Sequence, residues 1–134
     1  MLAKERGAKR AVPLKVSAAF HSPLMRAAAD GLAAAVARAV ITDVRTPVIS
    51  NVTAELLTQA DAIRHELIAQ VTSPVRWISS VRRMVDDGVD TFVEIGPGSV
   101  LTGLIKRIVP DAGLVNMSDW ASARAFGENS GVRS

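Results

Sequence analysis

The alternation of helical and extended apolar patterns limits what this chain of 134 residues can fold into. Apolar residues recur at helical spacing in several segments, and short β-branched runs lie between these segments. Strands that alternate with helices favour a parallel sheet with crossover helices on both faces, so the expected fold class is α/β. The pattern predicts helices over about 2–8, 23–41, 61–73, 75–87 and 99–109, and strands over about 12–17, 47–52, 91–95 and 113–117.

Local signals mark the helix ends and the faces that should be buried. Ser22, Asp61 and Ser99 each stand where an N-cap residue is expected, and Gly88 stands where a left-handed C-cap residue is expected. Residues 121–134 show no periodicity and should fray. The stripes expected to be buried are Leu24, Ala28, Leu32, Ala35, Val36 and Ala39, then Ile63, Leu67, Ile68 and Val71, then Ile78, Val81 and Val85, and finally Leu101, Leu104, Ile105 and Ile108.

Composition excludes several functional classes. The absence of cysteine excludes a disulfide framework and a thiolate nucleophile. The net charge of +3 lies entirely in residues 1–10, and only 4% of the residues are aromatic, so we expect no nucleic-acid partner. No apolar stretch reaches the roughly 20 residues of a membrane span, and no Cys, His, Asp or Glu cluster has metal-ligand spacing. We therefore expect a soluble, cytoplasmic protein without a metal or a membrane partner.

Two segments carry candidate chemistry, because each follows a predicted strand where parallel sheets place their sites. His21 stands at the start of the helix over 23–41, where the helix N-terminus disfavours a positive charge, so it suits a general base. A purely structural role for His21 is the alternative, and His65 is expected to be a solvated surface residue. The Gly96-Pro97-Gly98 turn could cradle a phosphate or simply allow a tight turn, but it matches neither nucleotide-binding fingerprint.

A series of sequence blocks resembles one known family. The run Ser-Ala-Ala-Phe-His-Ser-Pro-Leu-Met at 17–25 strongly resembles the active-site histidine segment of malonyl-CoA:acyl carrier protein transacylases. The same segment occurs in the acyltransferase domains of fatty-acid and polyketide synthases. Further blocks agree in order and spacing, and the resemblance covers about residues 3–118; these blocks are 7–14, 47–52, 61–64, 73–77 and 94–104.

The resemblance implies a division of the chain. Residues 1–16 would be the end of a ferredoxin-like small subdomain, and residues 17–120 the C-terminal part of an α/β-hydrolase-like core. Residues 121–134 would form a disordered tail.

The resemblance also implies an activity and its residues. In that family a serine takes malonyl from coenzyme A and passes it to the phosphopantetheine thiol of acyl carrier protein, a step of fatty-acid biosynthesis, with no cofactor beyond these substrates. The match makes His21 the base and Gln70 its hydrogen-bond partner, through the backbone carbonyl rather than the side-chain amide. Phe20 and Asn51 would belong to the substrate site, with Phe20 lining the acyl pocket.

One departure from the family is large. The chain contains no Gly-x-Ser-x-Gly nucleophile elbow, and the family's malonyl-pairing arginine would also lie upstream. We therefore expect a fragment that is inactive alone and that needs another polypeptide to supply the missing N-terminal half. The alternatives are a catalytically inactive interaction module, a polyketide synthase fragment, and an unrelated α/β domain that binds phosphate.

Overall fold

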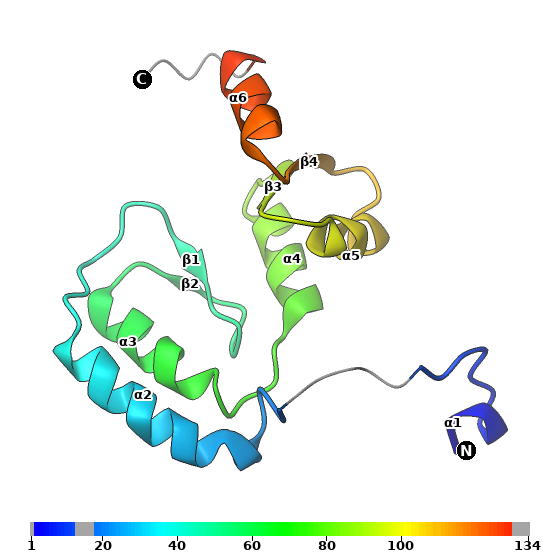
Figure 1. Cartoon of the computed structure of the whole chain (residues 1–134). Coiled ribbons are helices and arrows are strands. Elements are labelled where there is room, and N and C mark those ends of the chain that lie inside the picture. Colours follow the sequence, from blue (N-terminus) through cyan, green and yellow to red (C-terminus); the bar gives the residue numbers. More distant parts are fainter. Residues whose placement is uncertain (1, 13–17, 130–134) are drawn as a thin grey trace.

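The computed structural model describes residues 2–12 and 18–129, which form an α/β fold as predicted (Figure 1). In chain order the elements are α1 (Leu2–Glu5), the 3-10 helix η1 (Pro23–Met25), α2 (Arg26–Arg38), β1 (Val48–Ile49), β2 (Leu56–Leu57), α3 (Ala60–Ala69), α4 (Trp77–Asp86), β3 (Thr91–Ile95), α5 (Val100–Ile108), β4 (Gly113–Met117) and α6 (Trp120–Asn129).

The parallel part of the fold is the β3–β4 pair, which runs in register from Thr91 beside Gly113 to Ile95 beside Met117. Helix α5 makes the crossover between the two strands, and α4 packs beside α5 (Figure 1). The core here consists of Val81, Phe92 and Ile105, one residue each from α4, β3 and α5. This packing places the carboxyl ends of β3 and β4 side by side.

The second part of the fold differs from the expected parallel arrangement. The predicted strand over 47–52 shortens to β1, which pairs antiparallel with β2, a strand that the periodicity did not predict. The chain reverses between them in a tight turn, where Ala54 adopts a left-handed φ of 64°. The backbone N–H groups of Val52 and Thr53 donate to Ser50 Oγ. A side chain, and not a neighbouring strand, therefore accepts the hydrogen bonds of the turn.

Contacts between α2 and α3 set helix ends that local signals misplaced. Helix α2 ends at Arg38 rather than near residue 41. The guanidinium of Arg64 on α3 donates hydrogen bonds to the carbonyl groups of Val36, Ala39 and Ile41, so these carbonyls need no further helical turn. Helix α3 begins at Ala60, so Asp61 is not its N-cap. The Ala60 N–H instead donates to Asp43 Oδ1 at 2.8 Å, a cap supplied from 17 residues away.

The expected buried stripes are only partly right. On α2, Ala29 and Val36 are buried, whereas Ala28 and Ala35 are exposed, as are Leu24 in η1 and Ala39 just after α2. An alanine-rich helix has several faces of nearly equal hydrophobicity, so contact with α3 selects the face. On α4 only Val81 of the predicted stripe is buried, and on α5 only Ile105 is; all four residues of the predicted α3 stripe are half-buried. Gly88 has the expected left-handed φ, 95°, directly after α4.

Residues 120–129 form helix α6 and do not fray as the sequence pattern predicted. Asp119 and Ser122 make a reciprocal cap: the Ser122 N–H donates to Asp119 Oδ1, and the Asp119 N–H donates to Ser122 Oγ. Residues 130–134 lie outside the described residues, as does most of the strand expected over 12–17, whose Val12 is not in a strand. The subdomain boundaries given above remain predictions.

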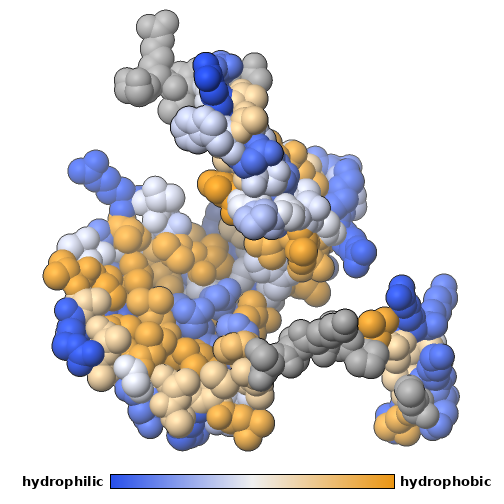
Figure 2. Space-filling view, viewed as in Figure 1, coloured by the Kyte–Doolittle hydropathy of each residue, from blue (hydrophilic) through white to orange (hydrophobic). Residues whose placement is uncertain are grey.

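The chain exposes an unusual amount of surface. Its accessible area is 10254 Å², whereas a compact monomer of 14.2 kDa has about 6,800 Å². Apolar side chains cover much of the surface over α2, α3 and the β1–β2 hairpin (Figure 2). Large apolar residues exposed on or beside these elements are Leu24, Val40, Val48 and Leu56. Within 2–12 and 18–129, no helix has the length and apolar character that crossing a membrane requires.

Candidate active site

His21 lies just before η1 and contacts the end of α3. Its Nδ1 atom is 2.8 Å from the carbonyl oxygen of Gln70, which lies 49 residues later in the chain. His21 is exposed and has a φ of 58°, a left-handed conformation that residues other than glycine seldom adopt. The neighbouring Ser22 does not cap the helix as predicted, because its hydroxyl donates to the Ala19 carbonyl at 2.7 Å. The strained backbone conformation therefore occurs at His21, the residue predicted to be the base.

The contact with Gln70 determines which ring nitrogen of His21 is free. A carbonyl oxygen can only accept a hydrogen bond, so Nδ1 must carry the proton in this contact. In the neutral imidazole Nε2 is then unprotonated and can accept a proton. The arrangement therefore gives His21 the tautomer that a general base needs.

Gln70 is the C-cap residue of α3, so its carbonyl is among those left without a partner within the helix. The C-terminus of a helix carries partial negative charge, which favours a cation beside it. His21 therefore lies beside the C-terminus of α3 as well as just before η1.

Three of the four residues expected at the site are brought together. Asn51 Nδ2 donates to Gln70 Oε1 at 2.8 Å, while Gln70 uses its backbone carbonyl for His21. Phe20 precedes His21 in the chain, and its side chain is 61% exposed. This exposure excludes Phe20 from the core of the described part of the chain and leaves its ring available to a ligand or to further polypeptide.

Glu66, on α3, holds the turn that carries Asn51. Its carboxylate accepts hydrogen bonds from Ser50 Oγ at 2.6 Å, from the Asn51 N–H at 2.7 Å and from the Val52 N–H at 3.2 Å. The sequence alone did not single out Glu66. Its spacing of four residues from Gln70 puts both side chains on one helix face, and this is the signal that could have found it.

The Gly96-Pro97-Gly98 turn is occupied by the chain's own groups. Gly96 and Gly98 have φ values of 130° and 95°, which explains glycine at both positions. Glu94 accepts hydrogen bonds from the backbone N–H groups of Leu101 and Thr102, so a carboxylate already covers the N-terminus of α5. Ser99 makes no side-chain cap. A bound phosphate would meet this negative charge, which argues against the phosphate-binding alternative.

Hydrogen bonds also set the ionisation of Glu94. The Thr102 hydroxyl and then the Thr102 backbone N–H lower the pKa of Glu94 below its usual value. The carboxylate is therefore the form that this turn stabilises.

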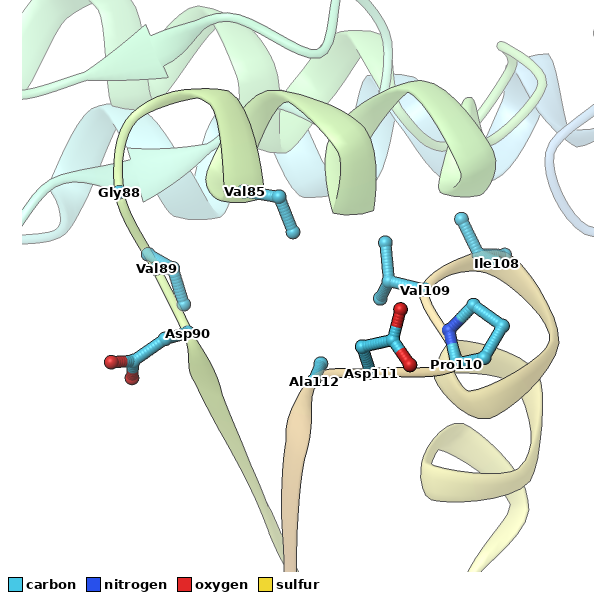
Figure 3. Close-up of a pocket in the computed structure, with 9 residues that line it drawn as sticks. All are labelled: Val85, Gly88, Val89, Asp90, Ile108, Val109, Pro110, Asp111 and Ala112. Atoms are coloured by element: carbon cyan, nitrogen blue, oxygen red, sulfur yellow. The ribbon is translucent and has the colours of Figure 1, made fainter.

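A hollow of about 470 Å³ lies away from these residues (Figure 3). It sits between the C-terminal ends of α4 and α5 and the two short segments, 88–90 and 109–112, that lead into β3 and β4. Apolar groups such as Val85 and Val109 line it, and the Asp90 carboxylate points away from it (Figure 3). Because it opens at the amino ends of the strands, opposite the edge where parallel sheets place chemistry, it is not the catalytic site.

Comparison with known proteins identifies the family. The profile of the acyl transferase domain matches residues 2–128 of this chain. The chain belongs to the acyl transferase domain family. It is 50% identical over 107 residues to a malonyl CoA-acyl carrier protein transacylase of Bacillus subtilis, a match that covers 80% of this chain and 34% of the relative.

Solved structures of acyl transferases superpose on the same region. An acyl carrier protein S-malonyltransferase from Vibrio cholerae matches with a TM-score of 0.85 and 47% identity, covering 92% of this chain and 40% of the other. A malonyl-transacylase solved in complex with its type II polyketide acyl-carrier protein matches with a TM-score of 0.86 and 44% identity, covering 94% and 41%. The chain thus spans about a third to two fifths of the length of these acyl transferases.

Two further expectations concern the surface and metal binding. His65 is exposed on α3, as expected for a surface residue. Among the residues that the structure describes, no three His, Cys, Asp or Glu side chains come together as metal ligands would.

Proposed function

We propose that this chain is the C-terminal part of a malonyl-CoA:acyl carrier protein transacylase and supplies the general base of that enzyme, His21. The observation that carries the proposal is the 2.8 Å contact between His21 Nδ1 and the Gln70 carbonyl, which leaves Nε2 free. Support also comes from the relatives, which are named malonyl transferases, and from the relative solved with its acyl-carrier protein. The proposed substrates are malonyl-CoA and the phosphopantetheine thiol of acyl carrier protein.

The first half-reaction would load a serine nucleophile. His21 Nε2 takes the serine proton as the serine oxygen attacks the malonyl thioester carbonyl, and the new O–C bond replaces the C–S bond. The imidazolium then returns this proton to the departing thiolate of coenzyme A. While the ring is charged, the Gln70 carbonyl and the C-terminus of α3 stabilise it.

The second half-reaction would run the same chemistry in reverse with a new thiol. His21 takes the proton of the phosphopantetheine thiol, and the thiolate attacks the malonyl-serine ester. The C–O bond breaks, and the serine oxygen receives the proton from His21. One base thus serves both acceptors, which is the logic of ping-pong acyl transfer.

The nucleophile itself would come from additional polypeptide. The 134 residues hold no Gly-x-Ser-x-Gly elbow. The accessible area exceeds that of a compact monomer of the same mass, and large apolar residues such as Val93, Ile95 and Leu101 are exposed beside the carboxyl edge of the sheet. We propose that the N-terminal portion of a transacylase covers this surface and brings the serine to His21, so that this chain alone is inactive.

Phe20 and Asn51 complete the proposed substrate site. The exposed ring of Phe20 adjoins the base, which supports a place for it at the acyl pocket. Asn51 lies on the same face through its bond to Gln70, and its backbone carbonyl accepts from the Arg76 N–H at 2.8 Å. Asn51 therefore has a fixed position from which to face substrate.

A chimera tests the proposal directly. The portion of the Bacillus subtilis relative that the match does not cover is fused ahead of this chain, and malonyl transfer from malonyl-CoA to acyl carrier protein is measured. We expect transfer by the chimera and none by the chain alone. His21→Ala should lower kcat/KM by about 10²-fold or more, whereas His65→Ala, on the surface of α3, should change it little.

Other outcomes separate the alternatives. Equal rates for His21→Ala and the unaltered chimera would refute the assignment of the base. A folded chimera that binds acyl carrier protein without any transfer would favour the inactive interaction module. A malonyl adduct on the chain alone, detected by mass spectrometry, would show that the chain carries its own nucleophile.

A further inference from the structure

Glu66 connects the His21 site to the turn between β1 and β2. Its carboxylate accepts from two successive backbone N–H groups, at Asn51 and Val52, and from the hydroxyl of Ser50. Ser50 is fully buried, and Glu66 is half-buried. Hydrogen bonds to an ionised carboxylate are shorter and stronger than those between neutral groups. Glu66 therefore fixes where this turn sits on α3.

The same turn reaches Gln70 through the side chain of Asn51. Asn51 Nδ2 donates to Gln70 Oε1 at 2.8 Å, one helical turn beyond Glu66 on the same face of α3. Gln70 is thus held by its side chain while its carbonyl holds His21 at 2.8 Å. The connected groups are, in order, Glu66, the Asn51 turn, Gln70 and His21.

His21 needs such support because little else places its ring. It is exposed, its φ of 58° is a conformation that costs free energy, and it follows a segment whose other described residues are exposed or half-buried. A base that is misplaced by about 1 Å can lose roughly 10²-fold in rate. Helices tend to fray at their ends, and Gln70 lies at the end of α3. The contacts of Glu66, one turn earlier, can therefore keep the Gln70 carbonyl in place.

We propose that Glu66 is a positioning residue for the His21 base and acts through the Asn51 turn and Gln70. The inference rests on the proposed function for its consequence in catalysis. The part of the proposal that concerns the His21 tautomer does not depend on activity.

The test uses the full 134-residue chain labelled with ¹⁵N in its imidazoles. The chain has two histidines, so His21→Ala identifies both sets of signals. At a pH where the rings are neutral, ¹⁵N shifts report the share of the Nδ1–H tautomer. We expect Nδ1–H to dominate at His21 in the unaltered chain, and we expect Glu66→Ala to reduce its share towards that of the exposed His65.

Two variants separate positioning from a general loss of stability. Glu66→Gln keeps an oxygen that can accept from Asn51 and Val52, so it should restore the Nδ1–H share. Glu94→Ala is the matched control, because it removes a carboxylate that accepts from two successive backbone N–H groups at α5. We expect Glu94→Ala to leave the His21 tautomer unchanged.

Asn51→Ala keeps both backbone N–H groups on Glu66 but removes the link to Gln70, so it should lower the Nδ1–H share even if Glu66→Ala fails to fold. An unchanged His21 tautomer in folded Asn51→Ala would overturn the proposal, as would an equal change in Glu94→Ala. If Glu66 does not control the His21 tautomer, the effect of His21→Ala on transfer by the chimera is not changed. If the chimera is inactive, the tautomer measured in the chain alone is not changed. The two proposals can therefore fail independently.

Discussion

The carbonyl oxygen of Gln70 and the Nδ1 atom of His21 lie 2.8 Å apart, although the two residues come from different elements of the fold. In serine hydrolases with a catalytic triad, a buried carboxylate takes this position and fixes the tautomer of the histidine. Here a neutral carbonyl at a helix C-terminus takes it. The carbonyl can therefore orient the His21 ring as a carboxylate would. It offers the ring only the partial negative charge of the helix end and not a full charge.

Gln70→Ala in the chimera should reduce malonyl transfer less than His21→Ala does. The substitution keeps the backbone carbonyl that holds His21 and removes only the side-chain contact with Asn51. We expect a loss of kcat of at most about tenfold, against about 10²-fold for loss of the base. Steady-state kinetics with malonyl-CoA check this expectation. A loss equal to that of His21→Ala would contradict this expectation and show that the side chain of Gln70 matters to the reaction as much as the base does.

Sequence could predict the pairing of His21 with Gln70 only through the family resemblance. No local pattern connects residues 49 positions apart, whereas the matching blocks at 17–25, 61–64 and 73–77 relate His21 to Gln70. Periodicity found most of the helices and the β3–β4 pair, because long amphipathic helices and short apolar strands leave clear repeats. The resemblance supplied Gln70, Phe20 and Asn51, whereas the place of His21 at a helix start had already indicated a base, and the periodicity supplied the class of the fold.

The elements that sequence misplaced depend on contacts between distant groups. The cap of α3 comes from Asp43, and the end of α2 is set by Arg64, so local capping rules at Asp61 could not locate either boundary. The partners of Glu66 lie 14 to 16 residues earlier, so its spacing from Gln70 could indicate a shared helix face but not its contacts with the turn. The cap at Asp119 and Ser122 is local and could have predicted α6.

Stability should depend on Glu94 in a pH-dependent way. The folded chain lowers the pKa of Glu94, so the carboxylate stabilises the fold above the unfolded pKa, and this contribution is lost as pH falls through the folded pKa. Glu94→Gln should therefore lower Tm at pH 7, and the difference from the unaltered chain should shrink in acid. Thermal melts followed by circular dichroism from pH 3 to pH 7 measure it.

Glu128→Gln serves as the control for Glu94→Gln, because Glu128 makes an exposed ion pair with Arg124 on α6. We expect a small difference in Tm for this variant at every pH. If the Glu94→Gln difference were constant across the pH range, the effect would come from packing and not from the ionisation of Glu94.

Among the residues predicted for the α4 stripe, only Val81 should lower the free energy of unfolding strongly when it is truncated. Val81 is fully buried against Phe92 and Ile105, whereas Val85 is exposed at the rim of the hollow. Val81→Ala removes two buried methyl groups and should lower the free energy of unfolding by about 2 kcal/mol. Val85→Ala should cost less than about 1 kcal/mol. Urea unfolding checks both, and equal losses would contradict the burial pattern.

Phe20 should set the choice of acyl group in the chimera. Its ring is exposed and precedes His21, so it can meet the carbon next to the thioester when the substrate lies at the base. A methyl group on that carbon would collide with the ring, and one misplaced methyl in a packed pocket changes binding by roughly 1 to 3 kcal/mol, or about 10- to 200-fold. The chimera should therefore prefer malonyl-CoA to methylmalonyl-CoA.

Phe20→Ser should narrow this preference chiefly by admitting methylmalonyl-CoA, because the smaller side chain leaves room for the methyl group. The measurement is the ratio of kcat/KM for the two thioesters in the chimera and in the variant. Leu24→Ala is a useful control, since Leu24 is also apolar and exposed close to His21 in sequence but is not adjacent to it. If Phe20→Ser and Leu24→Ala both leave the ratio unchanged, Phe20 does not set the choice of acyl group.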